Sequence, residues 1–173
     1  MSAVRRIAIL GAESTGKSTL AAQLAAHYGT PWVPEYLREF VDTHGRTPHE
    51  GDQYGIARTQ LERENQAAAR AGRFLFCDTT PLMTAVYSRV YWGRVPPELL
   101  ALEAAHDYAL TLVAAPDSPW VADGLQRVSE QERERVHRLV LATLDERQIP
   151  FVLVEGDLPR RMRQVRDLLG PAA

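Results

Sequence analysis

The sequence predicts a single three-layer α/β domain over residues 1–173, built on a five-stranded parallel sheet, and three observations lead to that fold class. Short apolar runs alternate with longer amphipathic stretches of helical period. The apolar runs are continuous and not alternating, as strands covered on both faces require. The composition, with 45% hydrophobic and 24% charged residues and a net charge of −2, is that of one soluble globular domain.

The first half of the chain supplies three of the strands. The apolar run 7–10 leads into a helical stretch over about 17–28, and the short run 32–33 completes a βαβ pattern. A second helical stretch over about 50–71 precedes the buried strand 74–77. Since parallel neighbours need crossover connections, these helices are expected to pack on the faces of the sheet.

The second half continues the same alternation. A helix is expected over about 81–91, followed by a fourth strand at 108–114. The polar segment 129–147 begins with the S-x-x-E pattern of a capping box, which predicts a helix start. The run 150–154 gives a fifth strand, and a last helix is expected near 159–169.

Charge and cysteine content exclude several classes of function. Twenty Lys and Arg against 22 Asp and Glu leave no basic excess for a non-specific grip on nucleic acid. Cys77 is the lone cysteine, which excludes an intramolecular disulfide and a multi-cysteine zinc site. The first apolar run is too short for a signal peptide or a membrane span. We therefore expect a cytoplasmic protein that acts on a small molecule, without nucleic-acid or membrane partners; its oligomeric state is left open.

The strongest motif is GAESTGKS at Gly11 to Ser18, which matches G-x-x-x-x-G-K-[ST] between an expected strand and an expected helix. This pattern predicts a P-loop NTPase domain that binds ATP and Mg²⁺. The glycines let backbone N–H groups point at phosphate oxygens, Lys17 would reach the β and γ phosphates, and Ser18 would be a Mg²⁺ ligand. The residues expected to bind the nucleotide are Gly11, Glu13, Ser14, Thr15, Gly16, Lys17, Ser18 and Thr19.

Lys17 is the only lysine, and the other 19 basic residues are all arginine. A sequence so biased towards arginine that keeps one lysine at this position indicates that a compact ammonium is needed there.

Two acids follow expected strands at the edge of the sheet where ligands of open α/β sheets bind. Asp78 ends the third apolar run, whose neighbour should be the P-loop strand, so its carboxylate is expected near Mg²⁺; a helix cap shared with Thr79 and Thr80 is the alternative. Glu35 is placed to accept the proton of an acceptor hydroxyl, or else is a first-turn helix glutamate. Arg38 lies one turn later, and faces the cleft or forms a surface ion pair.

The segment 120–138 lies where small P-loop kinases carry a mobile lid. Its charged residues are Asp123, Arg127, Arg133 and Arg135, among others. Lid arginines would stabilise the transferring phosphoryl group on closure, and the alternative is a solvated helix face with Glu–Arg pairs. Four aromatic residues flank the motifs and would either stack on a planar base or pack in the core. They are Trp32, Tyr36, Trp92 and Trp120.

Together these blocks resemble the ribosylnicotinamide kinase domain of NadR-type proteins, among the AAA and nucleoside-kinase-like P-loop ATPases. The resemblance covers about 7–169 and rests on GAESTGKS, on EYLREFV from Glu35, on DTT from Asp78 and on WVADGL at 120–125, in that order. It implies an ATP-dependent kinase that phosphorylates the 5′-hydroxyl of nicotinamide riboside and gives nicotinamide mononucleotide in NAD salvage.

The resemblance also implies roles for residues of this sequence. The catalytic residues would be Lys17, Glu35, Asp78 and Arg127, with Ser18 and Asp78 at the metal. The substrate would be bound by Glu35, Tyr36, Arg38, Asp78 and Asp123. NadR-type proteins often carry an adenylyltransferase domain, and sometimes a DNA-binding domain, before the kinase. Because the first expected strand begins so near residue 1, we expect a kinase that stands alone.

Two positions depart from the family pattern. Thr80 stands where the family often has a second acid, which leaves open a P-loop kinase for another nucleoside or small hydroxyl compound. Gln126 stands between Gly-Leu and Arg127, so the lid arginine is assigned to within one residue. A further alternative, from another class, is a nucleotide-hydrolysing regulatory switch, which would need a water-positioning residue in place of an acceptor pocket.

Overall fold

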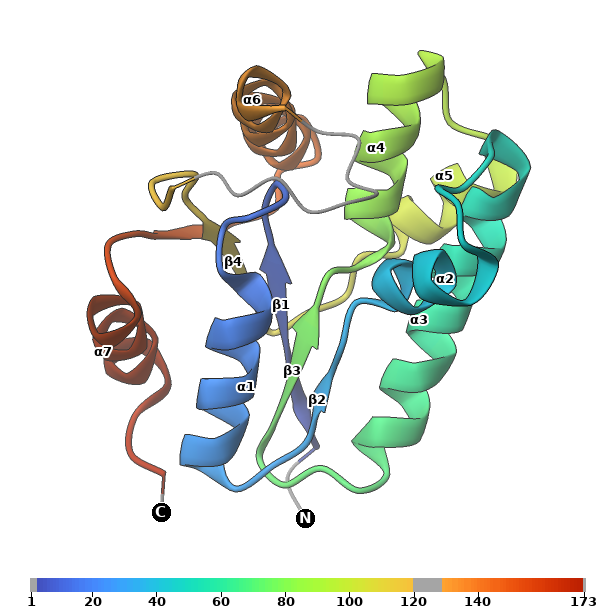
Figure 1. The fold of residues 1–173 in the computed structure, drawn as a ribbon. Coiled ribbons are helices and arrows are strands. Elements are labelled where there is room, and N and C mark those ends of the chain that lie inside the picture. The colour runs from blue at the N-terminus through green and yellow to red at the C-terminus, as the bar shows by residue number, and fades with distance from the viewer. Residues whose placement is uncertain (1–2, 120–128, 173) are drawn as a thin grey trace.

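The computed structural model describes residues 3–119 and 129–172, and within them it contains one five-stranded parallel sheet with the order β2-β3-β1-β4-β5 (Figure 1). The strands are β1 (Arg5–Leu10), β2 (Trp32–Val33), β3 (Phe74–Asp78), β4 (Leu110–Ala114) and β5 (Val152–Val154). Every pairing is parallel. The predicted fold class is thereby confirmed, and each strand overlaps the apolar run that predicted it.

Helices cover both faces of this sheet, which gives the three layers. They are α1 (Lys17–Tyr28), α2 (Tyr36–His44), α3 (Gln53–Ala68), α4 (Pro81–Trp92), α5 (Pro97–Ala104), α6 (Glu130–Glu146) and α7 (Leu158–Leu169). The helices α1 and α7 pack on one face, and α3, α4 and α6 pack on the other (Figure 1). Ser129 caps the predicted helix, because its side chain accepts a hydrogen bond from the Glu132 backbone N–H at 3.2 Å, which is one of the two bonds of a capping box.

Two helices lie outside the predicted helical stretches, and a third is shorter than expected. The helix α2 buries only Phe40, and α5 begins at Pro97, the second residue of a Pro-Pro pair, and buries Leu99 and Glu103. The expected helix 50–71 divides into a 3₁₀ turn, Glu50–Asp52, and α3. A proline in the first helical turn costs little because the N–H that it lacks has no intrahelical partner.

The central strand β1 explains why the core forms around the P-loop. Its side chains alternate between the two faces, so that Ile7 and Ile9 pack with α1 while Ala8 and Leu10 pack with α4 and α6. All four are fully buried. The strand therefore ends at the carboxyl edge of the sheet with its next residue, Gly11, already at the binding edge.

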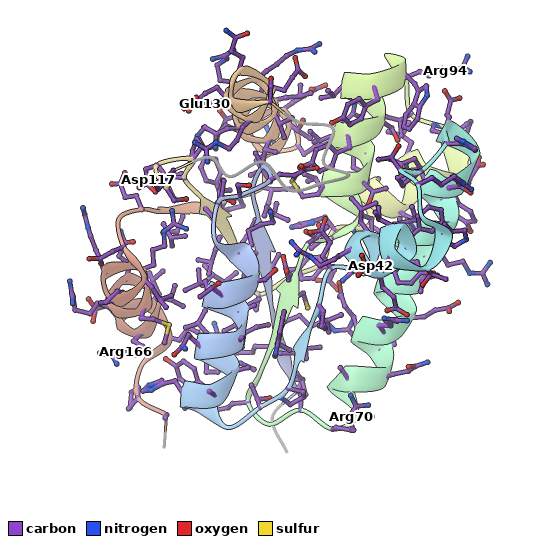
Figure 2. All side chains as sticks on the ribbon, viewed as in Figure 1. Asp42, Arg70, Arg94, Asp117, Glu130 and Arg166 are labelled. Atoms are coloured by element: carbon purple, nitrogen blue, oxygen red, sulfur yellow. The ribbon has the colours of Figure 1, made fainter. Side chains whose placement is uncertain are left out.

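The exposed surface carries charges of both signs, as Figure 2 shows for Asp42 and Glu130 on helices and for Arg70 and Arg94 in the turns after α3 and α4. Within the described part of the chain, no helix combines the length and the apolar character that crossing a membrane requires.

Candidate active site

The P-loop connects β1 to α1 in a conformation that depends on its two glycines. Gly11 has φ 148° and Gly16 has φ 84°, and Gly16 is the residue that caps α1. A Cβ on Gly11 would lie 3.0 Å from the Ala114 carbonyl oxygen, so a side chain there would push the loop away from β4. Lys17 is buried and donates from Nζ to the Ala12 carbonyl oxygen at 2.8 Å. The ammonium is thus held against the loop that is expected to bind phosphates.

Two buried arginines hold the carbonyl groups of this loop. Arg161 of α7 donates from Nη1 to the Thr15 carbonyl oxygen, and from Nη2 to the Ala115 carbonyl oxygen at 3.0 Å. Arg133 of α6 donates from Nη1 to the Ser14 carbonyl oxygen at 3.2 Å. The N–H and C=O groups of a peptide unit point in opposite directions, so carbonyls that face the arginines turn loop N–H groups towards the phosphate side.

Ser18 and Asp78 form the expected metal pair. The Ser18 hydroxyl donates to Asp78 Oδ2 at 2.6 Å, and Ile9 lies opposite Asp78 in the register of β1 and β3. Asp78 is fully buried, and its Oδ1 atom has no hydrogen-bond partner among the described residues. Burial raises the pKa of Asp78, and the Lys17 charge and the Ser18 hydrogen bond oppose that rise. A hydroxyl and a carboxylate oxygen with free acceptor capacity fit Mg²⁺, which takes one or two protein ligands besides phosphates and water.

The capping alternative for Asp78 is not what the structure shows. The residue that caps α4 is Thr80, and its side chain makes no capping hydrogen bond. Asp78 instead belongs to β3 and is bound to Ser18. Thr79, between them, has φ 80°, a strained conformation for a β-branched residue, and it lines the pocket described next.

Glu35 lies at the turn from β2 into α2 and faces the same group of charges. It occupies the position before α2 but makes no side-chain capping bond. Burial of the carboxyl raises its pKa to about 7; the charges of Asp78 and Glu13 add to this rise, and Lys17 and Arg38 oppose it. A carboxyl with a pKa near neutral is suited to proton transfer at physiological pH.

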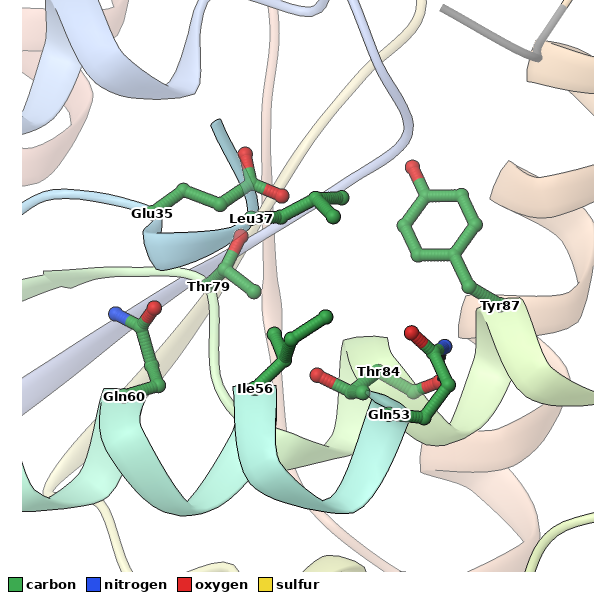
Figure 3. A pocket seen from close by; sticks show the side chains of 8 residues that line it. All are labelled: Glu35, Leu37, Gln53, Ile56, Gln60, Thr79, Thr84 and Tyr87. Carbon is green, nitrogen blue, oxygen red and sulfur yellow. Dashed lines mark hydrogen bonds between the residues drawn. The ribbon is translucent and has the colours of Figure 1, made fainter. Parts of the chain in front are cut away.

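A small open pocket lies beside Glu35 (Figure 3). Its lining comes from α2, α3, α4 and the end of β3, and consists of Glu35, Leu37, Gln53, Ile56, Gln60, Thr79, Thr84 and Tyr87. The lining is mixed, with aliphatic and aromatic surface, two amides, two hydroxyl-bearing threonines and one carboxyl. Such a combination is typical of sites for small organic molecules.

Gln60, which the sequence analysis did not single out, ties the Glu35 segment to the end of β3. Its Oε1 accepts from the Tyr36 backbone N–H at 2.7 Å, and its Nε2 donates to the Pro34 carbonyl oxygen at 3.1 Å. The same Nε2 lies 3.4 Å from the Asp78 carbonyl oxygen. Gln60 is 2% exposed, so this one amide sets the spacing between the two acidic residues. The signal for it was the i, i+3, i+7 spacing of Gln53, Ile56 and Gln60 on one face of a helix.

Three further predicted residues lie outside the pocket lining. Tyr36 is not in the pocket lining; its ring is covered by the Arg63 guanidinium, 4.8 Å from the ring centroid. Arg38 is exposed on α2, yet near enough to lower the pKa values of Glu35 and Asp78. Thr19 is exposed in the first turn of α1.

Two arginines of the predicted lid segment, Arg133 and Arg135, lie within the described residues. Arg133 is 3% exposed and bound to the P-loop and to the Ser118 carbonyl oxygen at 2.9 Å, so it is fixed in the structure. Arg135 lies on α6 and pairs with Glu132 at 3.5 Å, as expected for a solvated helix face. Asp123 and Arg127 lie outside the described residues.

Comparison with known proteins places this geometry in a family. A family model described as an AAA domain matches residues 6–161. The Trifunctional NAD biosynthesis/regulator protein NadR of Escherichia coli (strain K12) is 33% identical over 177 residues, and so is the protein of the same name from Salmonella typhimurium (strain LT2). Each alignment covers 96% of this chain and 43% of the relative, so the chain spans less than half the length of the curated relatives it matches.

Solved structures show the same fold. A NadR protein in complex with NR has a TM-score of 0.82 at 22% identity, over 96% of this chain and 51% of that chain. A deoxyadenosine kinase from M. mycoides has a TM-score of 0.69 at 15% identity, over 95% of this chain and 98% of that chain. The fold is therefore that of P-loop kinases, the resemblance to NadR-type proteins is confirmed, and the chain belongs to the family that the AAA domain model describes.

Proposed function

We propose that this protein is an ATP-dependent kinase that transfers the γ-phosphoryl group to the 5′-hydroxyl of nicotinamide riboside. The observation that carries the proposal is the position of Glu35, which lines the pocket and interacts electrostatically with Lys17 of the P-loop and with Asp78. One carboxyl thus lies between a candidate acceptor site and a phosphate site. A nucleotide switch would have no need of such a pocket.

The groups of the chain have distinct tasks in this reaction. Loop N–H groups and Lys17 bind the phosphates of ATP. Ser18 and Asp78 would hold Mg²⁺, which neutralises phosphate charge when bound. The acceptor oxygen forms a bond to the γ phosphorus while the bond to the ADP oxygen breaks, and the hydroxyl proton passes to the Glu35 carboxylate.

Glu35 is suited to the proton transfer because of its environment. The buried carboxyl, with Asp78 and Glu13 nearby, holds a proton more strongly than an exposed glutamate does. Gln60 fixes the backbone on both sides of it. The roles of two further residues rest on the resemblance alone. Arg127 would stabilise the transferring phosphoryl group, and Asp123 would bind the substrate.

Nicotinamide riboside is proposed as the acceptor on two grounds. The curated relatives at 33% identity are named as NAD biosynthesis proteins, and a structurally similar NadR protein was solved in complex with NR. The pocket of this chain has the mixed apolar and amide lining that a riboside with an aromatic base requires.

The test is coupled ADP release with Mg·ATP and a panel of acceptors: nicotinamide riboside, nicotinic acid riboside, the common nucleosides and no acceptor. The proposal expects release that depends on nicotinamide riboside and gives a mononucleotide product. Release with another nucleoside alone would overturn the substrate and keep the kinase. Release without any acceptor would support the regulatory switch and overturn the kinase.

A further inference from the structure

The end of the pocket formed by the start of α3 carries a hydrogen-bond acceptor whose direction is fixed by the protein. Gln53 is 3% exposed, and its Nε2 lies 3.4 Å from the Thr84 carbonyl oxygen and 3.2 Å from Ser88 Oγ. A backbone carbonyl only accepts hydrogen bonds, so the amide nitrogen must be the atom that faces it. The Oε1 atom is then left to the pocket, and it has no hydrogen-bond partner among the described residues (Figure 3).

The distance between this acceptor and the reacting end of the pocket matches a nucleoside. Gln53, Ile56 and Gln60 line the pocket from one face of α3, and Gln60 is bound at the Glu35 and Asp78 end. Seven residues of helix at 1.5 Å each separate Gln53 from Gln60 by about 10 Å along the axis. That is the length scale of a nucleoside measured from its 5′ oxygen to the outer edge of its base.

The charge of the lining decides which base edge fits there. Among the residues that line the pocket, Glu35 is the charged one and there is no lysine or arginine. A base edge that carries a carboxylate would set its oxygens against Gln53 Oε1 with no cation to compensate, and a buried unpaired acceptor is costly. A base edge that carries an N–H group would pair with Oε1 directly.

We propose that Gln53 is a specificity-determining residue whose Oε1 accepts an N–H from the acceptor's base, so that the site favours a carboxamide riboside over the corresponding carboxylate riboside. The proposal rests on the proposed function, which identifies these two compounds as nicotinamide riboside and nicotinic acid riboside. Thr84 and Ser88 are positioning residues in it, because they hold the Gln53 amide in the orientation that selects the N–H group.

The test compares kcat/KM for nicotinamide riboside and nicotinic acid riboside in the wild type, in Gln53→Met and in Gln66→Met. Methionine has a similar length and cannot accept the bond, and Gln66 is an exposed glutamine on the same helix that serves as the matched control. The wild type is expected to favour the carboxamide by about 100-fold or more. The ratio should fall at least tenfold in Gln53→Met, mainly through the carboxamide substrate, and stay at the wild-type value in Gln66→Met. An unchanged ratio in Gln53→Met, or a wild type that favours the carboxylate, would overturn the proposal.

Two further pairs, tested with the wild type alone, separate this proposal from the proposed function and need no variant to fold. Adenosine and inosine, and cytidine and uridine, differ by an amino group against a carbonyl at the base edge. A preference for the amino member without activity on nicotinamide riboside would overturn the proposed substrate and support the role of Gln53. Phosphorylation of nicotinamide riboside and nicotinic acid riboside at equal kcat/KM would support the proposed function and overturn the role of Gln53. If no member of any pair is phosphorylated or shifts the melting temperature, both proposals fail.

Discussion

Replacement of Glu35 by glutamine removes the proposed proton acceptor and keeps the shape of the side chain. Proton transfer to a positioned base contributes about 10²- to 10⁴-fold, so turnover in Glu35→Gln is expected to fall by that factor while ATP binding is retained. In the wild type, kcat/KM should rise with pH around a midpoint near 7, the pKa to which burial raises this carboxyl. The variant should lack that rise.

The same substitution has a calculable effect on stability. The folded protein binds the Glu35 proton more tightly than the unfolded chain does, since the pKa rises from 4.5 to about 7. The corresponding stabilisation is fully present below pH 4.5 and is lost as the pH rises through about 7. At 1.36 kcal/mol per pKa unit, the loss is roughly 3 kcal/mol at most. Glu35→Gln has no carboxyl to ionise, so it does not lose this stability. The variant should therefore be more stable than the wild type at pH 8, and the two proteins should have similar stability at pH 4.

Urea unfolding at pH 4 and pH 8, together with steady-state kinetics between them, measures both effects. Glu39→Gln is the matched control, because Glu39 lies in the first turn of α2, four residues after Glu35, in an exposed ion pair with Arg63. It should keep the wild-type turnover and pH midpoint. Unchanged turnover in Glu35→Gln would refute the reasoning and move the role of base to Asp78. Equal stability at pH 8 would show that the carboxyl is not desolvated.

Three other substitutions test the parts that surround Glu35. Lys17→Ala should abolish ADP release and leave cooperative thermal unfolding, because the only hydrogen bond of the ammonium to a described residue is to the loop carbonyl of Ala12; a non-cooperative melt would contradict its assignment as a ligand contact. Arg161→Met strips buried carbonyls of their donor and should cost about 2–4 kcal/mol in denaturant unfolding and weaken ATP binding, whereas an unaltered ATP affinity would separate this arginine from the loop conformation. Gln60→Met should lower kcat with little change in the KM for ATP, and a purely structural role would instead lower stability alone.

The fold was predictable because its signals are local and agree with one another. The strand run at 74–77 is apolar on both faces, and the structure buries it completely within β3. The missed helices have weak local signals: α2 buries one residue, Phe40, and α5 is capped by Pro96 and begins at Pro97, a proline pair that also occurs in loops. α2 packs against α3, and α5 packs against α3 and α4, so both helices are stabilised by tertiary contacts that their own sequences do not show.

The site was predictable only where residues follow strands. Asp78 and Lys17 are placed by the sheet edge and by the loop motif, so their proximity followed from the pairing of β1 and β3. Gln53 and Gln60 lie on a long polar helix, where glutamines are expected to face solvent. They become pocket residues because α3 packs against α4 and the end of β3; their i, i+7 spacing puts them on one helix face but does not say what that face packs against.

The single lysine in a chain of arginines has its explanation in the two sides of the P-loop. On the outer side, Arg161 uses its planar fork to reach the carbonyls of Thr15 and Ala115 and the Asp117 carboxylate together, and a lysine could not span them. On the phosphate side a compact charge is needed, because the Lys17 ammonium must fit among phosphate oxygens without filling the loop. Arginines thus orient the carbonyls of the loop, and the lysine is placed to neutralise the phosphates that the loop binds, so exchange of either type for the other should harm binding even though the charge is kept.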